Sequence, residues 1–216
     1  MKESVLYVHG KCGSAAESER YRPLFPGCEV FGLDYQTSTP WEAGAEICAA
    51  AEKLKAEYES IILIANSIGA FFSMNAGIDS MIRKAYFISP IVAMEKLIGD
   101  MMQWANVTEA ELKSKVVIHT SFGEDLSWEY LRYVREHPIR WSVPTNILYG
   151  SKNRVSCLHA RPTGFCQWAF CVNAPGQGDP SHSRCRSART MIVSVRHEKI
   201  FRVVNRRIIL YDIDSV

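Results

Sequence analysis

A serine between small residues is the clearest candidate for chemistry in this sequence. Ser67 lies within Ala65-Asn66-Ser67-Ile68-Gly69, a variant of Gly-x-Ser-x-Gly. In that motif, small residues two positions before and after the serine permit a sharp turn between a strand and a helix. The turn exposes the hydroxyl, so that it can attack a carbonyl carbon. The structural alternative is that the hydroxyl of Ser67 caps the following helix.

Attack by a serine also requires N–H donors, because negative charge develops on the substrate oxygen. We expect one donor to be the backbone amide of Ile68, the residue after the serine. The second is expected from His9-Gly10-Lys11-Cys12-Gly13, where glycines permit close backbone approach. The amide of Lys11 is the predicted donor in this segment. Taken alone, the segment is equally compatible with an ordinary glycine turn.

A histidine must take the proton of the serine, and an acid must orient that histidine. His182 is the predicted base, with Asp179 nearby as a candidate acid. His197, which follows an apolar run, is the second candidate, and the third interpretation is that no base is present. The other histidines are expected to be structural or are too near a strand: His9, His119, His137 and His159.

The elements that must position these groups alternate between strands and helices. Apolar runs predict strands over residues 5–9, 29–34, 61–65, 84–90 and 144–150. Helical spacing predicts helices over 40–58 and 68–76, the first with Thr39 and Pro40 at its start. Strands separated by helices imply a parallel sheet covered on both faces. Short segments at 169–172, 191–195 and 207–211 are also strand-like.

Residues 91–142 interrupt this alternation, and we call them the insertion. A Met-rich helix is predicted over 94–104, a helix start at Thr108, and a further helix over 127–136.

These features together resemble the α/β-hydrolase family, in particular its small bacterial members. The resemblance extends from residue 4 to about 152 and rests on these segments: Val8-His9-Gly10-Lys11-Cys12-Gly13, Asn66-Ser67-Ile68-Gly69, Phe87-Ile88-Ser89-Pro90, Phe122-Gly123-Glu124, Leu126-Ser127-Trp128-Glu129-Tyr130 and Pro144-Thr145-Asn146-Ile147-Leu148-Tyr149-Gly150. The family implies an α/β fold with a mostly parallel sheet flanked by helices. It also implies a serine nucleophile, followed in the chain by an acid and then a histidine. The insertion would be a small helical lid over the acyl pocket.

The sequence departs from the family at the acid. The family places an acid two or three residues after the strand that ends at Gly150, and here Asn153 occupies that place. An amide does not stabilise an imidazolium as a carboxylate does. In serine proteases the equivalent change lowers turnover about 10⁴-fold.

The composition of the chain changes at the same point. Residues 1–153 contain 15 Lys and Arg against 19 Asp and Glu, whereas residues 154–216 contain 10 against 4, and nine of those ten are Arg. Two interpretations follow for this atypical C-terminal segment. It is either a divergent native segment or the product of a shifted reading frame that replaced the true end of the fold.

The whole-chain composition excludes several classes of protein. A length of 216 residues, 47% of them hydrophobic, predicts a single domain over residues 1–216. No apolar run is long enough to span a membrane, and a cytoplasmic location is the default expectation. Neither a nucleotide-binding glycine motif nor a basic, aromatic nucleic-acid surface is present. Cys166, Cys171, His182 and Cys185 do not have the spacing of a zinc site. We expect no cofactor, metal or nucleic-acid partner.

The sequence therefore predicts a serine hydrolase that cleaves a small carboxylic ester or thioester through an acyl-enzyme on Ser67. The alternative is a catalytically impaired homologue, whose acid and histidine are lost, that binds an acyl ligand or a partner. The sequence does not specify the substrate or the oligomeric state.

Overall fold

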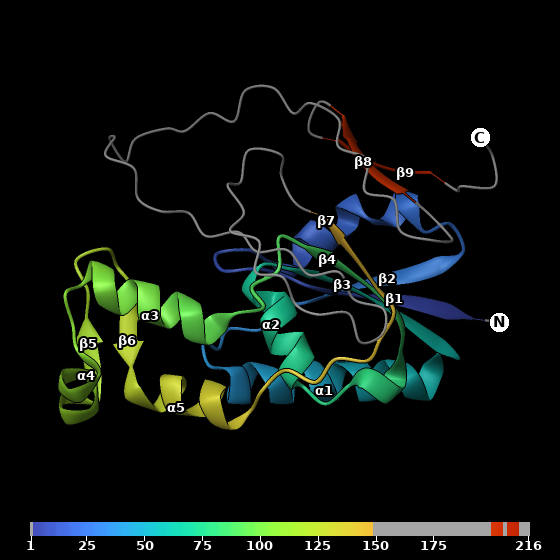
Figure 1. Cartoon of the computed structure of the whole chain (residues 1–216). Coiled ribbons are helices and arrows are strands. Elements are labelled where there is room, and N and C mark those ends of the chain that lie inside the picture. The colour runs from blue at the N-terminus through green and yellow to red at the C-terminus, as the bar shows by residue number, and fades with distance from the viewer. Residues whose placement is uncertain (1, 149–199, 205–206, 212–216) are drawn as a thin grey trace.

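The computed structural model describes residues 2–148, 200–204 and 207–211, the last two ranges as backbone only. A five-stranded parallel sheet lies at its centre, with the strand order β2-β1-β3-β4-β7 (Figure 1). The strands are β1 (Glu3–Val8), β2 (Cys28–Leu33), β3 (Ser60–Asn66), β4 (Ile82–Ile88) and β7 (Thr145–Leu148). All five correspond to strands predicted from the sequence.

The register of the sheet determines which residues leave it side by side. Val8 at the end of β1 is opposite Ala65 of β3, and Asn66 is opposite Ile88 of β4. Because the strands are parallel, their carboxyl ends meet at one edge. The segments that follow β1, β3 and β4 therefore begin next to one another.

Alternate residues of the central strands enter two different hydrophobic clusters. Leu6 and Leu63 belong to one cluster, whereas Tyr7 and Ile64 belong to the other. This division follows from the two-residue period of a strand, which sends neighbouring side chains to opposite faces. Each fully buried Leu or Ile stabilises the fold by about 1.5–3 kcal/mol. The apolar run of β3 thus reflects burial on both faces.

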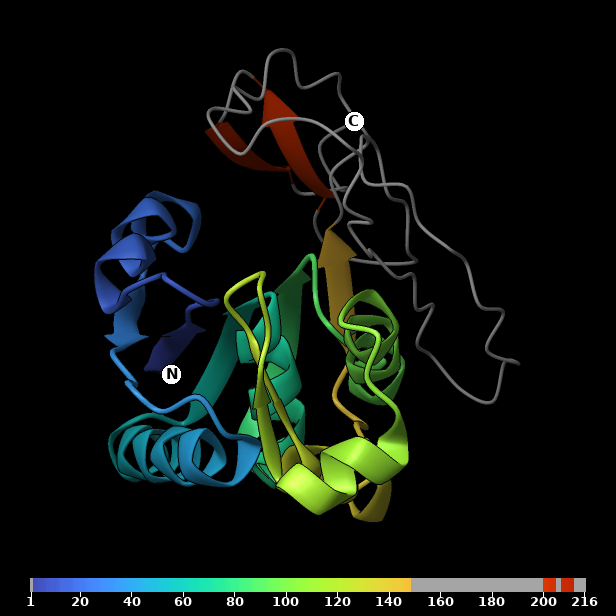
Figure 2. The ribbon, with the colours of Figure 1, turned by 90° about the vertical axis from the view of Figure 1, so that its left-hand side faces the viewer.

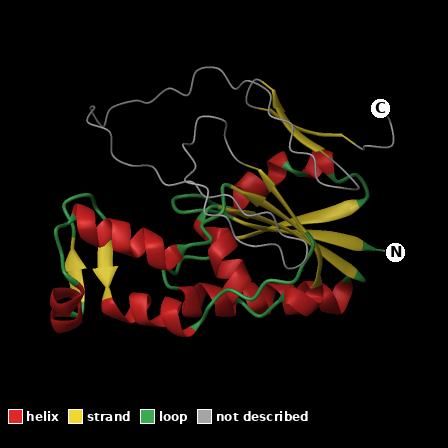
Figure 3. Ribbon diagram, viewed as in Figure 1, coloured by secondary structure: helices red, strands yellow, loops and turns green. Residues whose placement is uncertain are grey.

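Two helices cover one face of the sheet, below it in Figures 1 and 3. Helix α1 (Pro40–Glu57) begins after Thr39 with proline at its first position, and α2 (Ile68–Asn75) follows β3 directly. Both helices contribute to the larger cluster. The other face is covered by Tyr21 and Phe25, from around the short 3-10 helices η1 (Ala15–Arg20) and η2 (Arg22–Leu24). A third short 3-10 helix, η3 (Asp79–Met81), precedes β4.

The insertion is a group of short helices and one hairpin. Its elements are α3 (Met94–Trp104), α4 (Glu109–Lys115), β5 (Val117–His119), β6 (Asp125–Ser127) and α5 (Trp128–Glu136). The predicted helix over 94–104 and the helix start at Thr108 are confirmed, the latter by a reciprocal capping box with Glu111. The helix expected over 127–136 begins at Trp128, with Ser127 as its cap. The antiparallel pair β5–β6 was not predicted.

The strand predicted over 207–211 is present as β9 (Arg207–Tyr211) and pairs with β8 (Ile200–Val204) in a separate antiparallel sheet. The strand-like segments at 169–172 and 191–195 lie outside the described residues. Among the helices that the structure describes, none combines the length and the apolar character needed to cross a bilayer. The predicted α/β organisation, a mostly parallel sheet flanked by helices, is confirmed.

Candidate active site

Ser67 occupies a sharp turn between β3 and α2. Its backbone has φ 52° and ψ −118°, a conformation that a residue other than glycine rarely adopts and that costs about 1–3 kcal/mol. Neighbouring backbone groups hold the turn in place. The Ser67 N–H donates to the Ile88 carbonyl at 2.9 Å, and the Ser67 carbonyl accepts from Ala70 and Ile91, both at 3.2 Å.

The side chain of Ser67 is not used to cap α2. No side-chain capping hydrogen bond is made at this N-cap position, and Ser67 is only half-buried. The structural alternative for this serine, a helix cap, is therefore not observed. The residue as a whole is therefore not sealed in the core.

The glycine loop, residues 9–13, lies directly against the serine turn, residues 65–69. A Cβ added to Gly69 would lie 2.2 Å from the His9 carbonyl oxygen, and one added to Gly10 would lie 3.2 Å from the Cβ of Ser67. Larger residues at these positions would force the loop and the turn apart. The small residues of both motifs thus serve one purpose, which is close backbone contact beside Ser67.

The two amides predicted to donate hydrogen bonds lie in these two segments. Ile68 is the first residue of α2, where an amide has no acceptor within its own helix. Lys11 lies in a tight turn that is closed by the Gly13 N–H donating to the Gly10 carbonyl at 3.0 Å. The structure brings both segments beside Ser67, while their role as oxyanion donors stays a prediction.

Buried polar contacts fix the shape of the glycine loop. His9 is 6% exposed, and its ring stacks on Tyr35 with centroids 4.2 Å apart. Its Nδ1 donates to the Gly10 carbonyl at 2.8 Å, and the Tyr35 hydroxyl donates to the His9 carbonyl at 2.8 Å. Burial raises the pKa of Tyr35 to about 12, so this hydroxyl stays protonated as a donor. His9 therefore has the structural role expected of it.

Tyr35 is a positioning residue that sequence reasoning missed. It follows β2 with no motif around it, and only the expectation of a strand ending at Asp34 points to that edge of the sheet. The contact between Lys11 and Glu124 was also not predicted, because no motif in the sequence links these two residues. Glu124, in the turn between β5 and β6, forms an ion pair with Lys11, so the insertion reaches the edge that carries Ser67 (Figure 2).

The other predicted site residues are not brought to Ser67 by the described structure. His182, His197, His159, Asp179 and Asn153 lie outside the described residues, so the predicted base and acid stay predictions. His119 and His137 are engaged within the insertion: His119 pairs with Asp125 at 2.7 Å, and His137 stacks on Tyr133. Across the described ranges, no group of three or more His, Cys, Asp or Glu residues is placed to hold a metal ion.

Comparison with known proteins adds to this geometry. Neither the protein-family models nor the curated protein sequences include one that matches the chain. Among solved structures, the chain is similar to Est1E from Butyrivibrio proteoclasticus, with a TM-score of 0.52 and 15% identity over 71% of this chain and 68% of that chain. It is also similar to alpha/beta hydrolase domain-containing protein 10 from mouse, with a TM-score of 0.50 and 15% identity over 70% of each chain.

Identity this low establishes architecture and not activity. The parallel sheet flanked by helices agrees with these structural matches. The described part of the chain therefore has the α/β-hydrolase fold.

Proposed function

We propose that the protein is a serine hydrolase that cleaves a small carboxylic ester or thioester through an acyl-enzyme on Ser67. The observation that carries this proposal is the strained backbone of Ser67: the turn that holds it lies against the glycine loop, and its hydroxyl does not cap α2. Strain at a residue other than glycine persists only where the surrounding structure enforces it, and such strain clusters at functional sites.

In the proposed reaction, the Ser67 oxygen attacks the carbonyl carbon while a histidine takes its proton. The amides of Lys11 and Ile68 bind the oxyanion, and one such donor typically contributes 10²- to 10³-fold in rate, an order-of-magnitude figure of about 3 kcal/mol. The histidine then returns the proton to the leaving alcohol or thiol. Water then attacks the acyl-enzyme: the histidine takes a proton from the water and returns it to the Ser67 oxygen as the acid product leaves. His182 is the proposed base.

The insertion is the proposed lid of this single domain. The ion pair between Glu124 and Lys11 supports this role, since it joins the insertion to the glycine loop. Of the methionines in α3, Met94 and Met102 are buried in the larger hydrophobic cluster. Their burial favours core packing as their role, rather than lining an acyl pocket.

A fluorophosphonate probe tests the proposal, because it reacts covalently with activated serines. We expect stoichiometric labelling of the wild-type protein and none of Ser67→Ala. Ser80→Ala is the matched control, because Ser80 is exposed in η3, and it should label like wild type. Equal labelling of the wild type and Ser67→Ala, or labelling of neither, would contradict the proposal.

One observation favours a second candidate function, a catalytically impaired homologue that binds an acyl ligand. Asn153 stands where the family has its acid, and an amide there removes much of the activation of the histidine. In that case the folded protein would not label, yet a short-chain acyl ester would raise its melting temperature, because a ligand that binds only the folded state stabilises it.

A further inference from the structure

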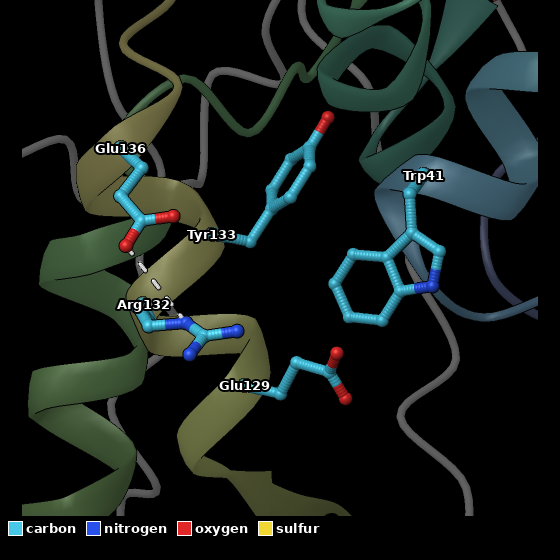
Figure 4. Close-up of a pocket in the computed structure, with 5 residues that line it drawn as sticks. All are labelled: Trp41, Glu129, Arg132, Tyr133 and Glu136. Carbon is cyan, nitrogen blue, oxygen red and sulfur yellow. Dashed lines mark ion pairs between the residues drawn. The ribbon is translucent and has the colours of Figure 1, made fainter.

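A recess of about 190 Å³ lies between the start of α1 and the helix α5, with no lining residue in the serine turn or the glycine loop (Figure 4). Its lining residues are Trp41, Glu129, Arg132, Tyr133 and Glu136. Pockets for drug-sized ligands measure about 300–1,000 Å³. The recess is smaller than these, so it fits one small group.

Two aromatic rings form walls of this recess. The rings of Trp41 and Tyr133 have centroids 5.2 Å apart, with their planes inclined by 56°. Other rings hold both in place. Trp41 contacts Tyr130, with centroids 6.1 Å apart, and His137 stacks on Tyr133, with centroids 4.0 Å apart. A ligand therefore meets aromatic surface that is already ordered.

The charges around the rings favour a cation. Arg132 lies 3.8 Å from Glu136, so these two charges largely offset each other. In the described part of the chain, Glu129 has no ion-pair partner, and its carboxylate points toward Trp41 in Figure 4. One uncompensated carboxylate beside two electron-rich aromatic rings attracts positive charge and repels anions.

The same arrangement distinguishes between kinds of cation. Calcium takes six to eight oxygen ligands and magnesium demands an octahedral shell, which a single free carboxylate does not supply. A methylated ammonium ion instead spreads its charge over methyl groups that contact ring faces, the common use of aromatic recognition sites for cations. We propose that this recess binds a small N-methylated ammonium ion, with its methyl groups on Trp41 and Tyr133 and its charge beside Glu129.

Choline and its uncharged isostere 3,3-dimethylbutan-1-ol are the probes for this site. Titration of the full chain, labelled with ¹⁵N at tryptophan, should shift the indole signal of Trp41, which is identified by its loss in Trp41→Phe. We expect choline to shift this signal at millimolar concentration and the isostere, which has the same shape without charge, to bind at least about fivefold more weakly. The Ser67→Ala variant should bind choline like wild type, because this site does not depend on the proposed hydrolase activity.

Two variants test the residues individually. Trp41→Leu is expected to weaken choline binding about fivefold or more, followed by calorimetry. Glu129→Gln keeps the shape of an exposed side chain and should weaken binding about two- to fivefold. Glu57→Gln, an exposed carboxylate at the far end of α1, is the matched control and should leave binding unchanged. Circular dichroism establishes that each variant is folded.

Three results would overturn the proposal. The first is the absence of any Trp41 shift at millimolar choline. The second is equal binding of choline and its neutral isostere, which would make the recess merely apolar. The third is unchanged affinity in the folded Glu129→Gln variant, because the carboxylate is what selects a cation here.

Discussion

Gly69 and Gly99 both lie inside helices, but only Gly69 faces neighbouring backbone at close range. A Cβ on Gly69 would lie 2.2 Å from the His9 carbonyl oxygen, whereas one on Gly99 would meet nothing within 4 Å. Alanine is favoured over glycine in a helix by about 1 kcal/mol. Replacement by alanine therefore brings the same gain in helix propensity at both positions, but only at Gly69 does the added methyl group collide with neighbouring backbone.

We predict that Gly69→Ala lowers the free energy of unfolding by about 1–3 kcal/mol, the usual cost of overpacking. Gly99→Ala should raise it by about 0.5–1 kcal/mol. Urea unfolding followed by circular dichroism measures both changes. Equal effects at the two positions would mean that the glycine loop does not press against α2.

At the scale of elements, the ion pair between Lys11 and Glu124 joins the glycine loop to the hairpin β5–β6 across the edge of the sheet. The side chains are 57% and 45% exposed, so water screens the pair and its contribution is small. The pair nonetheless connects the loop that carries a proposed oxyanion donor to the proposed lid. Reversing one charge should therefore affect the reactivity of Ser67 more than the stability of the fold.

We predict that Glu124→Lys slows fluorophosphonate labelling of Ser67 by about two- to fivefold at low salt. The double variant Lys11→Glu with Glu124→Lys should restore the rate. The difference should shrink at about 1 M salt, where the Debye length falls to about 3 Å.

A second ion pair supplies the control. Glu3 and Arg83, 3.0 Å apart, both lie at the amino ends of their strands β1 and β4, away from the carboxyl ends beside Ser67. Glu3→Arg should therefore leave the labelling rate unchanged. If Glu3→Arg and Glu124→Lys slowed labelling equally, the effect would arise from overall charge and not from this contact.

The elements that sequence reasoning found are those with long apolar patterns. Strand β3 and helix α1 bury several side chains each, and burial at a fixed period leaves a visible signal. The hairpin β5–β6 was missed because each strand has three residues, most of them half-buried or exposed. The predicted proximity of Ser67 to the glycine loop followed from parallel strands, which end at one edge. By contrast, the contact of Trp41 with Tyr133 joins helices that are far apart in the sequence, so no local sequence pattern predicts it.

At the scale of the whole molecule, the described hydrophobic core is made by residues before the change in composition. Both clusters of buried residues lie within residues 5–143, and the basic, Arg-rich part begins at residue 154. The coding DNA tests the hypothesis of a shifted frame. Under that hypothesis, one alternative frame after codon 153 encodes an aspartate close to the junction and a Gly-x-His further on. If neither alternative frame encodes them, the hypothesis of a shifted frame is wrong and the segment is a divergent native one.

A chain that ends at Lys152 separates folding from reactivity. Because the described core precedes that point, we predict that the shortened chain unfolds cooperatively and retains the far-ultraviolet circular dichroism of a parallel α/β sheet. It should label with a fluorophosphonate at least about 10³-fold more slowly than the full chain, since the proposed base lies beyond its end and a triad without its base loses several orders of magnitude in rate. His182→Asn in the full chain should match this loss, while His197→Asn should not. A folded, shortened chain that labels at the full rate would place the base of Ser67 within residues 1–152 and exclude both histidines.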